Sequence, residues 1–280
     1  MEDLYTNTVI CVQADGNQSE WFQFSAGVQQ GCNIAPDLFL EPIMDWVMDR
    51  TVHRGFAGIS IGSQVFTDLD FADDVAVLSE MLEILILSLE ILYYEALPLG
   101  LEINCDKTKI QGSAFNTANS ASVSVLGNPV ELVESFTYLG CRIDACGGSK
   151  EEILRSIEIA RGCMVSLTKN IQYIWRSSIT HSVKIRLYNT YVLPVLLYGS
   201  ELWDVTAKSG KRLDAFDQWC LRHILQVPFT VHVTNQTVRI RSAQPPVTQT
   251  IMARRLRFFG HIVRSDSDED HTGPQRWHRR

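Results

Sequence analysis

The chain has 280 residues, enough for one large domain or two of ordinary size. A hydrophobic content of 45% and a mean hydropathy of -0.01 are typical of a globular protein with a substantial core. The longest apolar run, residues 81–97, contains three glutamates, and the first residues are acidic, so neither a membrane-spanning helix nor a secretory signal is expected.

The net charge of -7 is divided unevenly along the chain. Residues 1–147 hold 5 basic and 21 acidic side chains, whereas residues 148–280 hold 20 basic and 11 acidic ones. An acidic half can bind divalent cations and a basic half can neutralise phosphates. Two domains that differ in surface charge and share no ligand would give the same pattern, so both interpretations stay open.

Seven cysteines occur without a C-x-x-C pair. This odd number predicts free thiols in a reducing compartment, rather than a disulfide framework or a zinc site. We therefore expect an intracellular protein, in the nucleus or the cytoplasm.

The first half of the chain mixes strand and helix patterns. We expect short strands within residues 2–24 around the turn signal Asp15-Gly16-Asn17, a helix from Pro36 to about residue 53, strands at 65–70 and 75–78, and a helix over 81–97. Further short strands are expected at 101–104, from residue 107, in two pieces over 123–133, and as one strand over 136–143. The strands are expected to be antiparallel, which makes an α+β layer.

The second half is mainly helical. The patterns predict helices over about 150–174, 178–203 and 207–227, then two short helices within 234–265 on either side of Pro245-Pro246. Pro194 should kink or split the second of these helices. Ser149 and Glu152 match a capping box at the start of the first.

The most informative segment is Phe71-Ala72-Asp73-Asp74, which lies between the two strand patterns of a predicted hairpin. Two carboxylates held at a hairpin tip are suited to binding a pair of Mg²⁺ ions for phosphoryl transfer. Adjacent aspartates are also ordinary turn residues. The segment alone therefore leaves both interpretations open.

Several segments, in order, resemble the motifs of reverse transcriptases of the non-LTR retrotransposon type. They are Gly27-Val28-Gln29-Gln30-Gly31-Cys32 with Pro36, the acidic Phe71–Asp74 segment, Gly100–Asn104 with Lys107-Thr108-Lys109, Phe136–Gly140, Leu193–Glu201, Cys220–Leu225 and Arg254–His261. The resemblance spans about residues 5 to 265. It implies a partial polymerase palm over 1–147, a helical thumb over 148–228, a basic helical region over 229–265 and a disordered tail over 266–280.

The resemblance also implies roles for particular residues. Asp73 and Asp74 would hold two Mg²⁺ or Mn²⁺ ions, and Lys107 would act on the leaving pyrophosphate. The other implied contacts are Gln30 and Gly31 with the template and nucleotide, Tyr138, Leu139 and Gly140 with the primer, and Arg254, Arg255 and Arg257 with nucleic acid. The substrates would be an RNA template, a DNA primer and deoxynucleoside triphosphates. For Lys107, the primer residues and the arginines, purely structural roles remain open.

The chain departs from the family pattern in two places. Gln29, Asn33 and Ala35 replace an arginine, a proline and a serine of the loop motif. The family's other catalytic aspartate, in a pattern like F-x-D-x-x-x-A-F-D, does not occur in these 280 residues. We therefore expect an N-terminally truncated RNA-directed DNA polymerase that is inactive or weak by itself. The alternatives are a non-catalytic nucleic-acid-binding remnant, or an interaction protein or relic without polymerase function.

Overall fold

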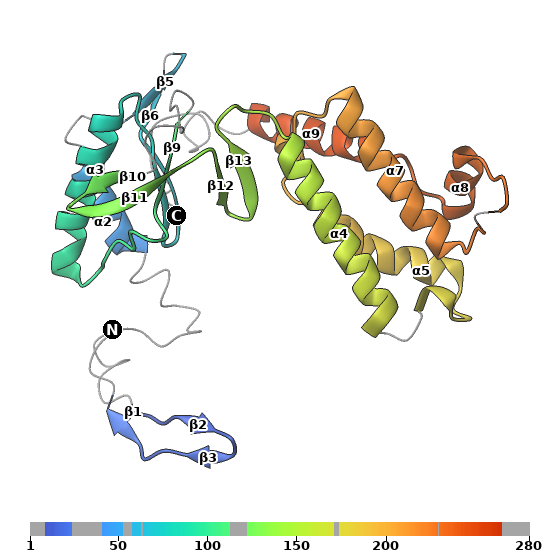
Figure 1. The fold of residues 1–280 in the computed structure, drawn as a ribbon, viewed down its shortest axis with the longest axis horizontal. Coiled ribbons are helices and arrows are strands. Elements are labelled where there is room, and N and C mark those ends of the chain that lie inside the picture. The colour runs from blue at the N-terminus through green and yellow to red at the C-terminus, as the bar shows by residue number, and fades with distance from the viewer. Residues whose placement is uncertain are drawn as a thin grey trace. The chain divides into compact units, whose positions relative to one another are not determined.

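The computed structural model describes residues 9–23, 41–52, 58–62, 64–112, 122–170, 174–228 and 230–264 (Figure 1). The chain forms two compact units. The N-terminal unit contains residues up to 104 together with 125–127, and the helical unit contains residues 105–124 and 128–271. Within the described residues, no helix is both long and apolar enough to span a bilayer.

The N-terminal unit begins with two small antiparallel pairs. Strand β1 (Val9–Ile10) pairs with β4 (Phe22–Gln23), and β2 (Gln13–Ala14) pairs with β3 (Asn17–Gln18). The β2–β3 connection consists of Asp15 and Gly16, which have φ angles of 51° and 79°. These positive values suit a tight two-residue hairpin turn, so the turn predicted from Asp15-Gly16-Asn17 is confirmed.

Two more hairpins follow in this unit. Strand β5 (Ile59–Ile61) pairs with β6 (Gln64–Phe66), and β7 (Asp68–Phe71) pairs with β8 (Asp74–Val77). The backbone N–H of Leu78 donates to the Thr67 carbonyl at 2.8 Å, and the N–H of Gly58 donates to the Leu78 carbonyl at 2.8 Å. The first bond extends the β7–β8 pairing, and the second joins this hairpin to the residue that precedes β5.

Helices α2 (Glu41–Val52) and α3 (Leu82–Ala96) pack on each other, and the short helix η2 (Leu97–Leu99) follows α3. Arg50 of α2 lies 3.5 Å from Glu95 of α3 and stacks over the Trp46 ring at 4.2 Å. Gly100 caps the end of η2 with a φ of 76°. Its place two residues after Pro98 predicts this end.

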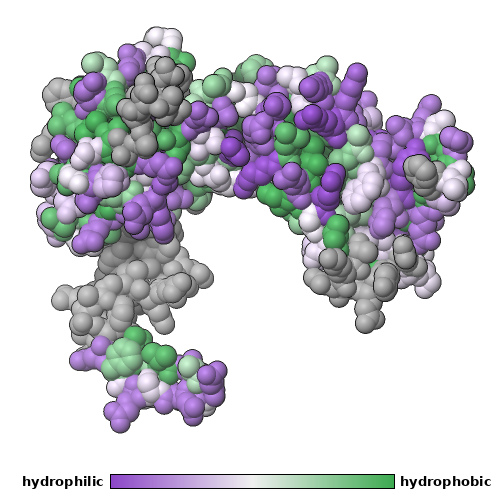
Figure 2. Space-filling model, viewed as in Figure 1, coloured by the Kyte–Doolittle hydropathy of each residue, from purple (hydrophilic) through white to green (hydrophobic). Residues whose placement is uncertain are grey.

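The N-terminal unit has a small core. Its buried apolar side chains, within the described residues, are Val47, Met48, Leu89, Leu92, Ala96 and Val125. Trp21 and Phe22 are 63% and 47% exposed. Figure 2 shows hydrophobic surface on the N-terminal hairpin. The buried apolar core among the described residues of this unit is therefore small.

The next part of the chain forms a small sheet of order β10-β11-β9, made of β9 (Lys109–Gln111), β10 (Ser122–Val125) and β11 (Asn128–Val133). Strand β11 runs parallel to β9, with Leu132 opposite Ile110. The expectation that all strands are antiparallel is therefore wrong here, because the chain makes a second strand, β10, before it returns to β9. Residues 101–104 do not form the predicted strand.

The segment predicted as a single strand over 136–143 is instead a hairpin. Strand β12 (Ser135–Tyr138) pairs with β13 (Cys141–Asp144), with Phe136 opposite Ile143. Leu139 and Gly140 connect the strands with φ angles of 47° and 79°. An apolar residue at the turn made the pattern look continuous, although the backbone reverses there.

The rest of this unit is helical. Its elements are α4 (Lys150–Asn170), η3 (Ile174–Arg176), α5 (His181–Leu187), the π-helical η4 (Tyr188–Val192), α6 (Leu193–Leu196), η5 (Ser200–Leu202), α7 (Ala207–Ile224), α8 (Asn235–Ser242) and α9 (Val247–Arg264). Pro194 is predicted to kink or split the second helix; the helical run continues through this proline to Leu196, but a π-helical turn directly precedes it. The two short helices expected around Pro245-Pro246 are α8 and α9.

These helices enclose one hydrophobic core. Trp175, Val192, Leu213 and Leu221 are fully buried in it, together with side chains from α4, α5, α8 and α9. Mixed small sheets followed by helices confirm the predicted α+β class at this level. The assignment of palm and thumb stays a prediction.

A buried polar network crosses this core. The Tyr188 hydroxyl donates to Asp217 Oδ1 at 2.5 Å, and the Arg239 guanidinium donates to Asp217 Oδ2 and to the Pro245 carbonyl. Asp217 is 2% exposed. Burial raises the pKa of this carboxyl, although the Tyr188 hydrogen bond and the Arg239 charge favour its ionised form. The network thus joins α7 to α8 and to the π-helical segment.

Candidate functional site

Asp73 and Asp74 lie where the sequence predicts them, at the tip of a hairpin. Phe71 of β7 is opposite Asp74 of β8, so Ala72 and Asp73 form the two-residue connection. Both aspartates are exposed. Their carboxylates therefore reach solvent from a short, hydrogen-bonded support.

The turn contains a strained position. Ala72 has a φ of 57°, a left-handed conformation that costs a residue with a Cβ roughly 1–2 kcal/mol. Such strain often occurs at functional sites, where it fixes a neighbouring side chain. Here the neighbour is Asp73.

One face of this hairpin carries apolar side chains. Leu69 and Phe71 lie on the same face as Asp74, as the strand alternation predicts, and they are 46% and 62% exposed. The acidic tip therefore adjoins an open apolar surface.

The fit of this tip to a metal is partial. Carboxylate oxygens are the ligands that Mg²⁺ and Mn²⁺ prefer. However, the part of the chain that the structure describes contains no group of three His, Cys, Asp or Glu side chains that could hold a metal ion. Asp68 has its own partner, because the Thr67 hydroxyl donates to its Oδ1 at 2.5 Å. That Asp73 and Asp74 are metal ligands stays a prediction.

The predicted primer-contacting residues form the tip of the β12–β13 hairpin. The Leu139 carbonyl accepts a hydrogen bond from the Tyr198 hydroxyl at 2.7 Å, and the Gly140 carbonyl accepts one from Arg155 at 2.9 Å. A Cβ at Gly140 would lie 3.2 Å from the Tyr198 ring. Glycine thus fits both the backbone conformation and the close approach, and helical residues hold the tip in place.

Glu152 holds the same hairpin close to its tip, at the second residue of β13, a role that the sequence did not predict. It is 5% exposed, and its Oε2 accepts a hydrogen bond from the Arg142 N–H at 2.8 Å and lies 3.3 Å from Arg155. The capping-box prediction is wrong, because Ser149 Oγ instead accepts from the Asp204 N–H at 2.8 Å. Each side chain of the predicted capping box thus accepts a hydrogen bond from a backbone N–H outside α4.

The other predicted site residues are spread over the chain. Lys107 lies in an exposed turn that precedes β9 in the helical unit. Gln30 and Gly31 lie outside the described residues. The roles of these three residues remain predictions.

The three arginines of α9 differ from one another. Arg254 faces the helical core, where its guanidinium donates to the Leu197 carbonyl at 2.9 Å and lies 3.4 Å from Glu201. Arg255 and Arg257 are exposed. Only these two therefore present their side chains to solvent for a partner.

An aromatic cluster that the sequence analysis missed lies on the surface of α7. Trp219 is 43% exposed and stacks between Phe216 and His223, with ring centroids 5.9 and 6.0 Å apart. The Arg161 guanidinium of α4 lies 5.9 Å from the Trp219 ring. The only sequence signal was the spacing of these aromatic residues along one helix face.

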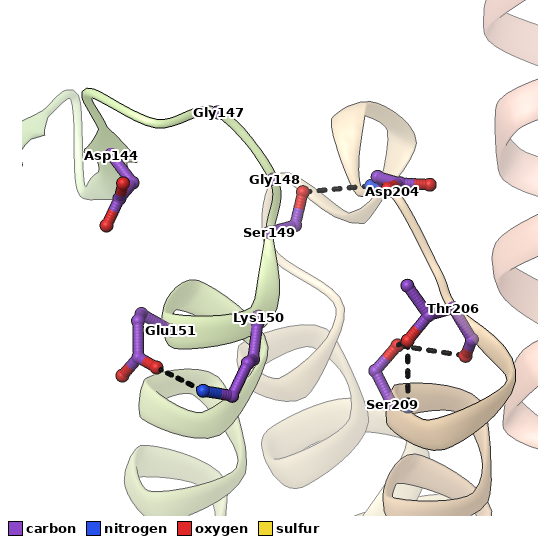
Figure 3. Close-up of a pocket in the computed structure, with 9 residues that line it drawn as sticks. All are labelled: Asp144, Gly147, Gly148, Ser149, Lys150, Glu151, Asp204, Thr206 and Ser209. Carbon is purple, nitrogen blue, oxygen red and sulfur yellow. Dashed lines mark hydrogen bonds and ion pairs between the residues drawn. The ribbon is translucent and has the colours of Figure 1, made fainter. Parts of the chain in front are cut away.

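A pocket of about 220 Å³ lies between the starts of α4 and α7 (Figure 3). Its lining includes Lys150, Glu151 and Asp204, and Lys150 pairs with Glu151 at 3.1 Å. Helix N-termini favour anions, whereas carboxylates in the lining repel them. The pocket therefore shows no clear preference for one charge.

Comparison with known proteins identifies the family. The family "Reverse transcriptase (RNA-dependent DNA polymerase)" matches residues 2–143. A transposon-derived protein of Caenorhabditis elegans is 26% identical over 214 residues, covering 73% of this chain and 74% of that protein.

Two polymerases of mobile elements are also similar. The RNA-directed DNA polymerase from the element jockey of Drosophila melanogaster is 24% identical over 208 residues, which cover 71% of this chain and 21% of that protein. A Pol polyprotein of the type-1 retrotransposable element R2 of Popillia japonica is 24% identical over 248 residues, covering 85% and 38%. The chain thus spans about a fifth and two fifths of their lengths.

The family match covers half of the chain and includes both the acidic hairpin and the β12–β13 hairpin. The similar polymerases come from non-LTR retrotransposons. The chain belongs to the reverse transcriptase family.

Proposed function

We propose that this chain contributes the acidic hairpin and the primer-positioning hairpin of RNA-templated DNA synthesis by two-metal nucleotidyl transfer. One observation carries the proposal: Asp73 and Asp74 are exposed at the tip of a hydrogen-bonded hairpin, inside the segment that matches the family. Lys107 and the residues predicted to contact the nucleotide and the primer belong to the proposal through the family's motifs.

In this proposal Asp73 and Asp74 would hold Mg²⁺ or Mn²⁺, which would supply the Lewis-acid chemistry that nucleotidyl transfer from a triphosphate to a primer 3′-hydroxyl requires. Lys107 neutralises pyrophosphate. Tyr138, Leu139 and Gly140 contact the primer from a tip whose carbonyls are already bonded to helical residues. A hairpin fixed in this way positions a ligand at little entropic cost.

We expect DNA synthesis by the chain alone to be absent or weak. The pattern that carries the family's other catalytic aspartate does not occur in these 280 residues. Each ~1.4 kcal/mol of lost transition-state stabilisation lowers a rate about tenfold, and the loss of one carboxylate ligand should cost several kcal/mol. A second polypeptide that supplies the missing carboxylate would restore activity.

Metal binding tests the acidic hairpin independently of activity. Mn²⁺ should broaden the backbone NMR signals of residues around Asp73 in the unmodified chain. Asp73→Asn should weaken this effect at least tenfold, because it removes one charged ligand. Asp15→Asn, at the tip of a different exposed hairpin, is the matched control and should change nothing. Equal broadening in all three proteins would refute the assignment.

Primer extension on an RNA template, with Mg²⁺ or Mn²⁺, tests the activity itself. We expect little or no product from the unmodified chain and none from Asp73→Asn. Robust synthesis that disappears in Asp73→Asn would overturn the expected inactivity, and it would mean that the chain supplies a third ligand elsewhere.

A second candidate function is nucleic-acid binding without catalysis. The exposed Trp219 with Arg161 over its ring favours this function, because an aromatic ring beside a cation can stack a base and neutralise a phosphate. The excess of basic residues in the second half of the chain would also attract the phosphates of a nucleic acid.

Binding to a primer–template, followed by fluorescence anisotropy, separates the two functions. Trp219→Ala should weaken binding about 5- to 100-fold, as expected for the loss of one stacked base. Tyr191→Ala, at another exposed aromatic residue of the helical unit, should not. Affinity should fall steeply with salt and survive Asp73→Asn. If binding at low salt is absent, or unaffected by Trp219→Ala, this candidate is wrong.

A further inference from the structure

Helix α9 has two apolar faces, and only one of them is packed. Val247 and Ile251 are buried at 2% and 1%, and Arg254 on the same side binds the Leu197 carbonyl. The contacts of α9 with α7 and η5 involve this side. The helix is therefore anchored along one face.

The opposite face carries a continuous line of exposed apolar side chains, here called the α9 stripe. It consists of Met252, Leu256, Phe259 and Val263, which are 64%, 62%, 64% and 64% exposed. Their spacing of four, three and four residues places them in one row, as at the a and d positions of a coiled coil. The row is about 16 Å long at 1.5 Å per residue.

Isolated exposed apolar residues are normal on protein surfaces, but a row of four is not. The spacing fits a second helix, whose side chains could insert between those of the α9 stripe. Ala253 and Gly260 lie beside the stripe, seven residues apart; Ala253 is small and exposed, whereas the Arg264 guanidinium covers Gly260, 3.0 Å from where a Cβ would lie. The shape of the surface thus indicates a helical partner.

The charges beside the α9 stripe indicate the chemistry of that partner. Arg255 lies on one side of it, the Arg264 guanidinium lies over Gly260 on the other side, and Arg257 lies farther round the helix. No ion pair joins these three arginines to another described residue. The 18 residues of α9 include no aspartate or glutamate. A partner helix with carboxylates at its flanks would complement these charges.

We propose that the α9 stripe is a docking site for an acidic amphipathic helix of another protein. Two α9 helices would place arginines against arginines, so charge repulsion disfavours a second copy as the occupant. Only one of the four stripe residues is aromatic, so the row offers little surface for stacking bases, which disfavours nucleic acid. An acidic helix satisfies both the apolar row and the basic flanks.

The test uses the full chain and two designed 21-residue helical peptides with leucine at their a and d positions. One carries glutamate at the flanking e and g positions and the other carries lysine. By anisotropy, the glutamate peptide should bind with a Kd on the order of 10 µM, and the lysine peptide at least tenfold more weakly.

Two variants locate the binding. Leu256→Ser combined with Phe259→Ser should weaken binding of the glutamate peptide at least tenfold, and both residues are exposed, so the fold should be retained. Ile240→Ser, at a residue 73% exposed on α8, is the matched control and should bind normally.

Four outcomes would overturn the proposal. They are equal binding of the two peptides, no binding of either, unchanged binding by the double variant, and displacement of the glutamate peptide by a 20-nucleotide single-stranded RNA. Concentration-dependent self-association in sedimentation, lost in the double variant, would identify a second copy as the occupant and would also overturn it.

Discussion

Replacing Arg239 by leucine should lower the free energy of unfolding of the helical unit by about 3–5 kcal/mol. The variant leaves the Asp217 carboxylate buried beside Tyr188 without its cation, and it also removes the bond to the Pro245 carbonyl. Urea denaturation followed by tryptophan fluorescence measures the change, since Trp175 and Trp203 are buried in this unit.

The matched control for this prediction is Arg241→Leu, on the exposed side of the same helix, which should cost less than about 0.5 kcal/mol. The pH dependence is a second control. Without Arg239, the pKa of Asp217 in the folded state should rise further above its ordinary value of 3.8, because burial then acts without the opposing charge.

The folded variant then retains a proton that the unfolded chain releases, so its stability should fall as the pH rises from about 4 toward neutrality. The deficit relative to the unmodified chain should therefore shrink on acidification. A deficit that is the same at pH 4.5 and pH 7, or an equal loss in Arg241→Leu, would contradict the proposed role of Arg239.

Replacing Glu152 by alanine should cost about 2–3 kcal/mol and loosen the β12–β13 hairpin. The change leaves the Arg142 N–H and the Arg155 guanidinium without their carboxylate partner at the junction of β13 and α4. Hydrogen exchange of the Arg142 amide should accelerate, and any binding of a primer–template that depends on this hairpin should weaken.

Glu151→Ala is the matched control for this variant. Glu151 occupies the same helical turn, but it is exposed and pairs with Lys150 at 3.1 Å, so its loss should cost at most about 0.5 kcal/mol. Both glutamates lie in the first turn of α4. Equal losses of stability in the two variants would therefore show that the effect comes from the helix dipole rather than from the hairpin contact.

The sequence predicted those elements whose limits depend on local chemistry. A π-helical turn directly precedes Pro194, Asp15-Gly16 formed a turn, and Pro245-Pro246 separated α8 from α9, because proline and glycine restrict or permit backbone angles wherever they occur. Features that depend on distant partners were not predictable. The parallel pairing of β11 with β9 is one of them.

The same distinction applies to the candidate site. The position of Asp73 and Asp74 at a hairpin tip followed from alternating strand residues on both sides. Glu152 and Arg254 could not be assigned, because the Arg142 N–H and the Leu197 carbonyl that they bind come from other elements. Their residue types gave no sign of these partners.

The small core of the N-terminal unit has a consequence for how the protein responds to its ligands. Few of its described apolar side chains are buried, whereas the helical unit encloses a large core. Local opening should therefore be most frequent around the acidic hairpin. A ligand that binds only the ordered form of this unit would stabilise that form by a free energy of RT ln(1 + [L]/Kd), where [L] is the concentration of free ligand. Protease resistance of residues 58–104 would then report occupancy directly, even where no chemistry takes place.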